Sequence, residues 1–145
     1  MPSLSDVNVL LAICHEDHIH HGSALQWLDG VDKPADVVVC RVSQLGLLRL
    51  LNNPAVMLGA PRDVRSAWRD FDALMLDERF IFQSEPARLE MTFRSIMPAR
   101  LSSPKLWQDA YLAAFALAAG YQFITFDTAF RQFADLDLLL MGHDV

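Results

Sequence analysis

The sequence predicts an α/β fold: a three-layer α/β/α sandwich with a mainly parallel central sheet. Short β-branched or aromatic runs, such as "VVVC" and "YQFITF", alternate with longer segments whose apolar residues have helical spacing. Strands that alternate with helices usually form a parallel sheet covered by helices on both faces. No repeat or linker interrupts the 145 residues, so we expect one domain, residues 1–145.

The first half of the chain predicts two strands and three helices. Ser3–Asp6 reads as a strand that turns directly into a helix over residues 7–13, and "SALQWLDG" as a short helix closed by Gly30. "VVVC" is typical of a buried strand. "SQLGLLRLLNN" predicts a helix with Ser43 as its N-cap, and the "NNP" that ends at Pro54 stops it.

The second half predicts the remaining elements. Residues 61–77 have apolar side chains at helical spacing, "RFIFQ" reads as a strand, and "SEPARLEMTFRSI" as a short helix capped by Ser84. Residues 104–119 form the strongest helical pattern, which Gly120 ends. "YQFITF" predicts a strand, "TAFRQF" a short helix, and "DLLLM" a last strand.

Composition limits the function classes. The net charge is −6, which disfavours non-specific coating of nucleic acid. An enzyme that holds metal ions among carboxylates can nevertheless be acidic. No apolar run approaches the roughly 18 residues of a membrane span, and the first residues lack the basic start of a secretory signal. The two cysteines, Cys14 and Cys40, fit buried thiols in a reducing cytosol.

Three carboxylates fall where they can meet. Asp6 and Asp127 close predicted strands, and Asp109 lies near the start of a predicted helix. Ligands of open α/β sheets bind outside the carboxyl ends of the strands, near the reversal of strand order. Carboxylates gathered there repel one another unless a cation neutralises them. Mg²⁺ and Mn²⁺ prefer such oxygen ligands, so the pattern points to a metal site.

Each of these acids also has a purely structural explanation. Asp6 and Asp127 stand where they could cap the helices that follow them. Asp109 lies beyond the first turn if Ser103 caps the helix, but a start near Trp107 would let the helix dipole favour it. Gln44 falls at the same edge, where its amide oxygen could hold a metal-bound water.

Four segments together resemble one family. "SDVNVLLAI", "VSQLGLLRLL", "WQDAYLAAFALAAG" and "FITFDTAF" resemble, in order and spacing, the PIN domains of the VapC toxins of bacterial toxin–antitoxin systems. The resemblance covers nearly the whole chain. It implies a three-layer sandwich and a ribonuclease that depends on Mg²⁺ or Mn²⁺.

The resemblance also implies site residues. Asp6, Asp109 and Asp127 would be the metal-binding and catalytic acids. Gln44 stands where the family commonly has Glu. This loss of a negative charge would lower metal affinity or make it depend more on RNA phosphates, and it leaves weak activity open. Asn8 would order the loop around Asp6, and Thr125 would hydrogen-bond a ligating carboxylate or water.

Partners follow from the same resemblance. VapC proteins usually form homodimers in the bacterial cytoplasm. They are inhibited by a small DNA-binding antitoxin, whose C-terminal segment covers the active groove and can place an Arg or Lys among the acids. RNA is the implied substrate, and no membrane is implied.

Other readings carry less weight. "HEDHIHH" has four histidines in seven residues, but it is not the HExxH zinc pattern and reads better as a polar connection between helices. An Asp-nucleophile phosphatase needs D-x-D after the first strand, and Asn8 replaces the second Asp. A non-catalytic PIN-like module for interaction or RNA binding, with Gln44 marking an eroded metal site, stays an alternative. Arginines recur on one side of the helix predicted over residues 61–77, and a solvated face is the usual explanation. The functional alternative is contact with an RNA backbone by Arg62, Arg65 and Arg69, to which Arg41, Arg49, Arg100 and Lys105 could contribute.

Overall fold

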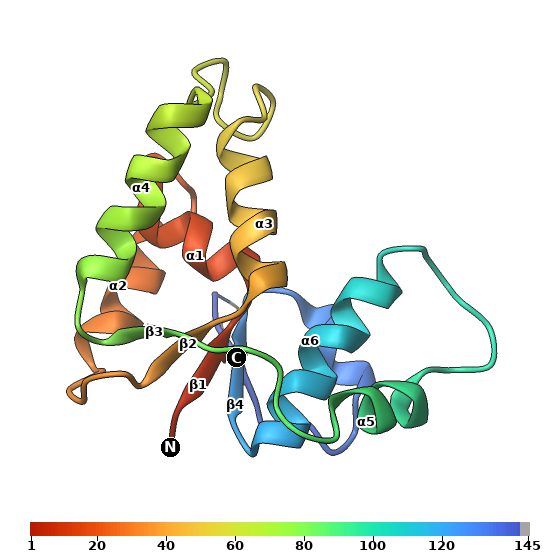
Figure 1. Cartoon of the computed structure of the whole chain (residues 1–145). Coiled ribbons are helices and arrows are strands. Elements are labelled where there is room, and N and C mark those ends of the chain that lie inside the picture. Colours follow the sequence, from red (N-terminus) through yellow and green to blue (C-terminus); the bar gives the residue numbers. More distant parts are fainter. Residues whose placement is uncertain (143–145) are drawn as a thin grey trace.

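A parallel sheet forms the centre of the molecule in the computed structural model, which describes residues 1–142 (Figure 1). Five strands in this range pair in the order β3-β2-β1-β4-β5, and every pair is parallel. The sheet agrees with the predicted one. The strands are β1 (Ser3–Ser5), β2 (Val37–Val39), β3 (Phe80–Phe82), β4 (Gln122–Thr125) and β5 (Leu138–Leu140).

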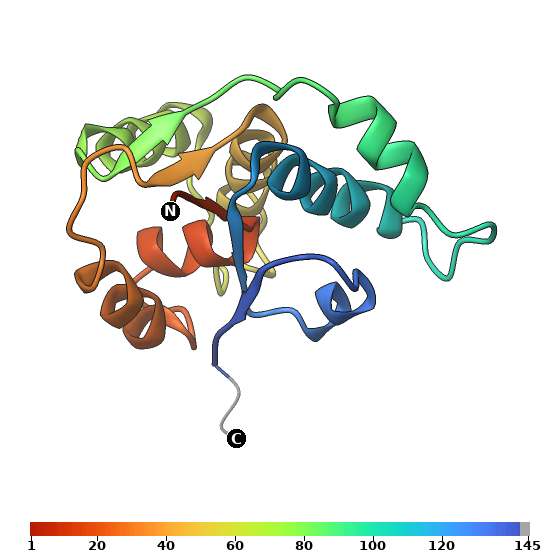
Figure 2. The same ribbon diagram turned by 90° about the horizontal axis from the view of Figure 1, so that it is seen from below.

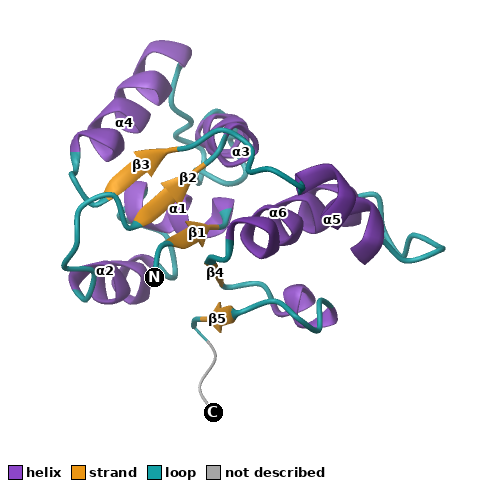
Figure 3. Cartoon of the chain, turned by 60° about the horizontal axis from the view of Figure 1, so that its bottom comes forward, coloured by secondary structure: helices purple, strands orange, loops and turns teal. Residues whose placement is uncertain are grey.

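Helices cover both faces of the sheet, as predicted. α1 to α4 lie on one side, and α5, α6 and the 3₁₀ helix η1 lie on the other (Figures 2 and 3). The fold is therefore a three-layer α/β/α sandwich. The helices are α1 (Val7–Cys14), α2 (His21–Asp29), α3 (Arg41–Leu51), α4 (Val64–Leu76), α5 (Leu89–Ile96), α6 (Leu106–Ala119) and η1 (Thr128–Gln132).

The apolar strands bind the two helical layers together. In β2, Val37 and Val39 pack in the cluster with α1, α3 and α4, whereas Val38 packs in the cluster with α6. All three side chains are fully buried, because consecutive side chains of a strand point to opposite faces. Burying each one contributes roughly 1.5–3 kcal/mol. A three-residue strand is therefore sufficient to join both layers.

Two predicted helix caps are wrong. α3 begins at Arg41 with Cys40 at its N-cap, and Ser43 is a buried residue of its first turn, 3.2 Å from the Cys40 thiol. α5 begins only at Leu89, after Arg88 in a left-handed conformation, so Ser84 lies well before it. In both cases contacts with the rest of the fold set the start of the helix, and the local capping preference does not.

The start of α6 also differs from the one that a Ser103 cap would give. The helix begins at Leu106, with Lys105 at its N-cap, and the Ser103 hydroxyl accepts a hydrogen bond from the backbone N–H of Lys105 at 3.2 Å. Asp109 consequently lies in the first turn, where the helix dipole favours a negative charge. Gly120 ends α6 in the left-handed conformation, as predicted.

The two cysteines differ in burial. Cys14 and Cys40 are both free; Cys40 is buried, as expected, but Cys14 is only partly so. Burial, followed by the charge of Asp70, raises the pKa of Cys14 to about 12.

No helix within residues 1–142 combines the length and apolar character needed to cross a membrane.

Gly46 allows α3 to approach α1 closely. A Cβ atom at Gly46 would lie 2.7 Å from Cγ2 and 3.0 Å from Cγ1 of Val7, which is shorter than side-chain contacts allow. Val7 follows Asp6 directly and is itself buried. Close helix packing at this point therefore supports the segment that carries one of the three predicted acids.

We expect Gly46→Ala to destabilise the protein by about 1–3 kcal/mol, because the added methyl group overpacks against Val7. Gly22→Ala is the matched control, since a Cβ there meets nothing within 4 Å. It should be neutral or stabilise α2 by up to about 1 kcal/mol. Urea denaturation of the two variants measures the difference. Equal stabilities would show that the close approach does not constrain this position.

Candidate active site

The three predicted carboxylates come together at the carboxyl edge of the sheet. Asp6 follows β1, Asp127 follows β4, and Asp109 lies in the first turn of α6. All three line one cavity of about 360 Å³. β1 and β4 are the neighbouring strands at which the strand order reverses. The cavity is therefore at the place where open parallel sheets bind their ligands.

Asp6 is held by two hydrogen bonds in a buried position. Its Oδ1 accepts from the backbone N–H of Val7 at 2.7 Å, and its Oδ2 accepts from the Thr125 hydroxyl at 2.6 Å. Burial raises the pKa of Asp6 to about 6, against the lowering effect of these hydrogen bonds; the nearby charge of Asp109 raises it further. The first bond caps α1, so Asp6 serves as a cap and also lines the cavity.

Asp127 likewise caps a helix and lines the cavity. Its Oδ1 accepts from the backbone N–H of Ala129 at 2.9 Å and caps η1, while its Oδ2 accepts from the Lys105 ammonium at 2.5 Å. Burial raises the pKa of Asp127, but these hydrogen bonds outweigh burial and bring it below its ordinary value. The capping explanation and the site explanation therefore both hold for this residue.

Asp109 is buried in the first turn of α6, next to Lys105. Its side chain is only 8% exposed, and the Lys105 ammonium lies 3.6 Å from its Oδ2. Burial raises the pKa of Asp109; Lys105 opposes this effect and Asp127 adds to it. Lys105 thus stands between the carboxylates of Asp109 and Asp127 and neutralises part of their charge.

Thr125 connects two of the acids. Its hydroxyl donates to Asp6 and accepts from the backbone N–H of Asp127 at 2.9 Å. The sequence suggests such a contact with a carboxylate, and the structure contains it. The part of Asn8 in ordering the loop around Asp6 stays a prediction, and Asn8 lines the same cavity as Asp6. Asn8 Oδ1 lies 3.5 Å from the backbone N–H of Phe126, so it links the start of α1 to the segment after β4.

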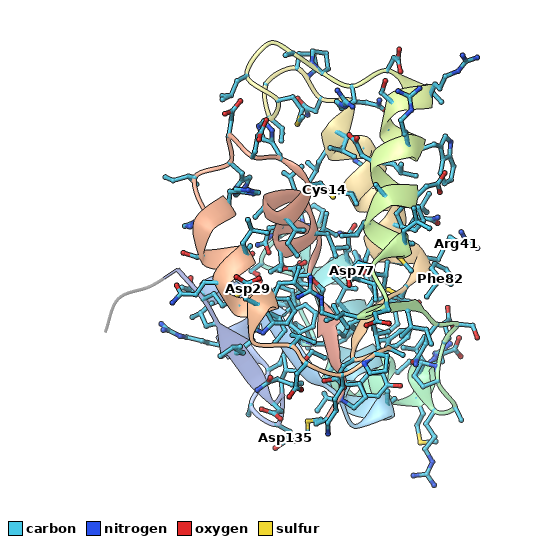
Figure 4. The ribbon with its side chains drawn as sticks, turned by 90° about the vertical axis from the view of Figure 1, so that its left-hand side faces the viewer. Cys14, Asp29, Arg41, Asp77, Phe82 and Asp135 are labelled. Atoms are coloured by element: carbon cyan, nitrogen blue, oxygen red, sulfur yellow. The ribbon has the colours of Figure 1, made fainter. Side chains whose placement is uncertain are left out.

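Gln44 pairs with Arg41 in the first turn of α3. It is buried, but it is not among the described residues that line the cavity. Its amide oxygen accepts from the Arg41 guanidinium at 2.5 Å, and Arg41 in turn lies over the ring of Phe82, 4.7 Å from its centroid (Figure 4). The amide oxygen of Gln44 is thus engaged with Arg41, and its part in metal binding stays a prediction.

The ion pairs of Lys105 were not expected from the sequence, which suggested this residue only as a possible RNA contact. The signal that could have revealed one of them is the spacing of Lys105 and Asp109, four residues apart on a helix. No local pattern indicates the pair with Asp127, 22 positions away in the chain. Four further polar residues line the cavity: Asn8, Arg49, Asn53 and Gln108.

The histidine-rich segment is a connection between α1 and α2, as predicted. His21 Nδ1 lies 2.6 Å from the carbonyl oxygen of Ala12, and the ring of His20 stacks on Phe126 at 4.4 Å. These contacts hold the segment against the fold. They give His20 and His21 structural partners within the protein.

Comparison with known proteins agrees with this geometry. The family model of the PIN domain matches residues 4–136. The chain belongs to the PIN domain family. It is 41% identical over 144 residues to the ribonuclease VapC41 of Mycobacterium tuberculosis, covering 96% of this chain and 98% of that protein. This PIN domain is therefore a relative of the VapC proteins, as the sequence motifs suggest.

Solved structures share the fold of this PIN domain. The structure of VapBC2 from Rickettsia felis, bound to a DNA fragment from its promoter, has a TM-score of 0.68 at 11% identity, over 97% of this chain and 98% of that chain. Mycobacterium tuberculosis VapC20, described as a toxin that cleaves the sarcin–ricin loop, has a TM-score of 0.63 at 19% identity, over 93% and 97%. At these identities the likeness concerns the fold alone.

The carboxylates of this PIN domain suit a divalent cation in their chemistry. All three offer hard oxygen atoms, which Mg²⁺ and Mn²⁺ prefer, and burial of Asp6 and Asp109 disfavours their negative charge. In the arrangement that residues 1–142 adopt, however, no three His, Cys, Asp or Glu side chains converge closely enough to hold a metal ion. Lys105 supplies the positive charge in its place.

We expect the protein without divalent cations to lose stability as the pH rises. The pKa of Asp6 is about 6 in the folded protein against an ordinary value of 3.8, so folding favours its protonated form. The stabilisation is complete below about pH 4 and is lost as the pH passes 6. It amounts to on the order of 2–3 kcal/mol, and the raised pKa of Asp109 acts in the same direction.

Urea denaturation in EDTA at pH 4.5 and pH 7.5 measures this loss. Other groups titrate over the same range, so Asp6→Asn is the matched comparison. The variant lacks the carboxyl group and should lose less stability than the natural protein by the stated amount. The same pH dependence in both proteins would contradict the assignment of the effect to Asp6.

Proposed function

We propose that this protein is a metal-dependent endoribonuclease and the toxin of a toxin–antitoxin pair, acting in the bacterial cytoplasm. One observation carries the proposal: three buried or half-buried aspartates from separate elements line a single cavity at the reversal of strand order. The cavity also contains the cations Arg49 and Lys105. The high identity to a ribonuclease over nearly the whole chain supports the same reaction.

Asp6, Asp109 and Asp127 are the residues that would hold Mg²⁺ or Mn²⁺. When bound, such an ion lowers the pKa of a water molecule and neutralises charge on a scissile phosphate. The chain contributes the orientation of the carboxylates. Thr125 fixes Asp6 through its hydroxyl and holds the backbone of Asp127, so two of the acids keep a constant relation to each other.

In this proposal the cations of the cavity bind the substrate. The net charge of −6 repels RNA at long range, so the backbone must be attracted locally. Arg49 from α3 and Lys105 before α6 both line the cavity, and both carry the donors that bind phosphate oxygens. Asn53 and Gln108 add neutral polar groups to the lining.

The proposed partner is a small DNA-binding antitoxin. VapBC2 of Rickettsia felis, which shares this fold, was solved on promoter DNA, and this supports a pair in which the partner provides the DNA contact. A homodimer of the toxin is also part of the proposal. Co-purification with the product of an adjacent short gene would test the pairing directly.

The first test is cleavage of a cellular RNA pool by the purified protein with Mn²⁺, with Mg²⁺ and with EDTA. We expect discrete products with either metal and none with EDTA. Asp109→Asn should reduce cleavage below detection. Asp135→Asn is the control, because Asp135 is an exposed acid before β5 (Figure 4) and does not line the cavity.

Two outcomes would contradict the proposal. Cleavage that persists in Asp109→Asn would show that the acids do not carry the reaction. A folded protein that neither cleaves RNA nor binds Mn²⁺ would favour the alternative, a non-catalytic PIN module.

A second prediction concerns Thr125. We expect Thr125→Val to lower the rate of RNA cleavage by about 10- to 100-fold, because Asp6 loses the hydroxyl that orients it. Thr125→Ser keeps the hydroxyl and should retain most of the activity. Single-turnover cleavage rates of the two variants decide the matter. Equal rates would show that the hydroxyl has no part in orienting the acid.

A further inference from the structure

Lys105 stands where a cation is needed. Its ammonium lies 2.5 Å from Asp127 Oδ2 and 3.6 Å from Asp109 Oδ2, so it bridges two of the three proposed metal ligands. We propose that Lys105 is an internal competitor of the divalent cation: it pairs with Asp109 and Asp127 in the metal-free protein and must leave before the ion binds. The inference rests on the proposed function, which assigns these acids to the metal.

The two cations exclude each other because of their geometry. Mg²⁺ binds oxygen at about 2.0–2.1 Å, whereas the ammonium lies 2.5 Å from the Asp127 carboxylate and 3.6 Å from that of Asp109. A metal ion that joined Asp109 and Asp127 would occupy the space of the Lys105 nitrogen. The carboxylates must then close around the ion, which agrees with the lack of a ready-made metal cluster within residues 1–142.

Lys105 is able to leave without disturbing the core. Its side chain is 61% exposed, although Asp109 and Asp127 are only 8% and 24% exposed. A lysine ammonium is a compact charge on a flexible stem, and the stem enters the cavity from its rim. Displacement therefore exchanges one cation for another and leaves α6 in place.

Ion pairs on the rest of the surface differ from this one. Arg62 with Asp70, for example, joins a half-exposed arginine to an acid on α4 that takes no part in the cavity. Such pairs contribute little to stability. Lys105 instead neutralises buried carboxylates whose mutual repulsion is otherwise uncompensated in the metal-free protein.

The experiment is a titration of the whole metal-free protein with Mn²⁺. The electron paramagnetic resonance signal of the free ion monitors the titration and gives the affinity. Lys105→Met removes the competing charge, and we expect it to bind Mn²⁺ about tenfold more tightly or better. Lys105→Arg keeps a cation in place and should bind no more tightly than the natural protein. Arg49→Met is the matched control for the general charge of the cavity.

Arg49 is exposed and lines the same cavity, but it is not one of the ion-pair partners of the acids among residues 1–142. Its removal should change Mn²⁺ affinity by less than about threefold, because a charge without direct contact is screened. Equal effects of Lys105→Met and Arg49→Met would overturn the inference. Weaker binding by Lys105→Met would overturn it as well.

Thermal denaturation gives a second readout that does not depend on activity. In EDTA, Lys105→Met should melt at a lower temperature than the natural protein, because two acids lose their partner. Saturating Mn²⁺ should remove the difference. A variant that is unchanged in EDTA would show that Lys105 does not neutralise the site.

The outcomes separate the inference from the proposed function. If the natural protein binds Mn²⁺, Asp109→Asn does not, and Lys105→Met equals the natural protein, the metal site stands and the inference fails. If only Lys105→Met binds Mn²⁺, the inference is supported in its strongest form. If neither protein binds the ion, the metal site of the proposed function and the inference fail together.

Discussion

Repulsion among three carboxylates at one edge of the sheet is the constraint on which the rest of the structure depends. β1 and β4 are parallel neighbours, so the residues after them, Asp6 and Asp127, must emerge side by side. α6 packs against both strands and adds Asp109 from its first turn. The topology that forms the core therefore also gathers negative charge, and a cation is needed wherever this fold keeps these three residues.

The same carboxylates take part in local structure. Asp6 and Asp127 each use one oxygen to cap the helix that follows and offer the other to a neighbour across the site. Capping places the carboxyl group before a helix at the edge of the sheet, which is also where a ligand binds. The structural and functional explanations of these residues are thus not alternatives. Because capping fixes the side chain, it also reduces the freedom that metal binding would have to remove.

The layers, the strands and the three acids could be predicted from the sequence because they depend on apolar periodicity and on strand direction. Val37 to Val39 reads as a buried strand whichever helices cover it. Starts of helices were less predictable, since Ser43 is drawn into the core beside Cys40 rather than capping α3. The pair of Lys105 with Asp127 could not be predicted at all. It joins residues 22 positions apart, and only the packing of α6 against β4 brings them into contact.

Gln44 and Lys105 act on the charge of the site in the same direction. VapC proteins commonly have Glu where this chain has Gln44. The glutamine is neutral, and its amide oxygen accepts a hydrogen bond from Arg41. Three carboxylates with the Lys105 ammonium carry a charge of about −2, and the departure of Lys105 restores −3 as a divalent cation enters. Because the ion would have to break both ion pairs of Lys105, the lysine weakens metal binding, and its release would free a cation beside a cavity that Arg49 also lines.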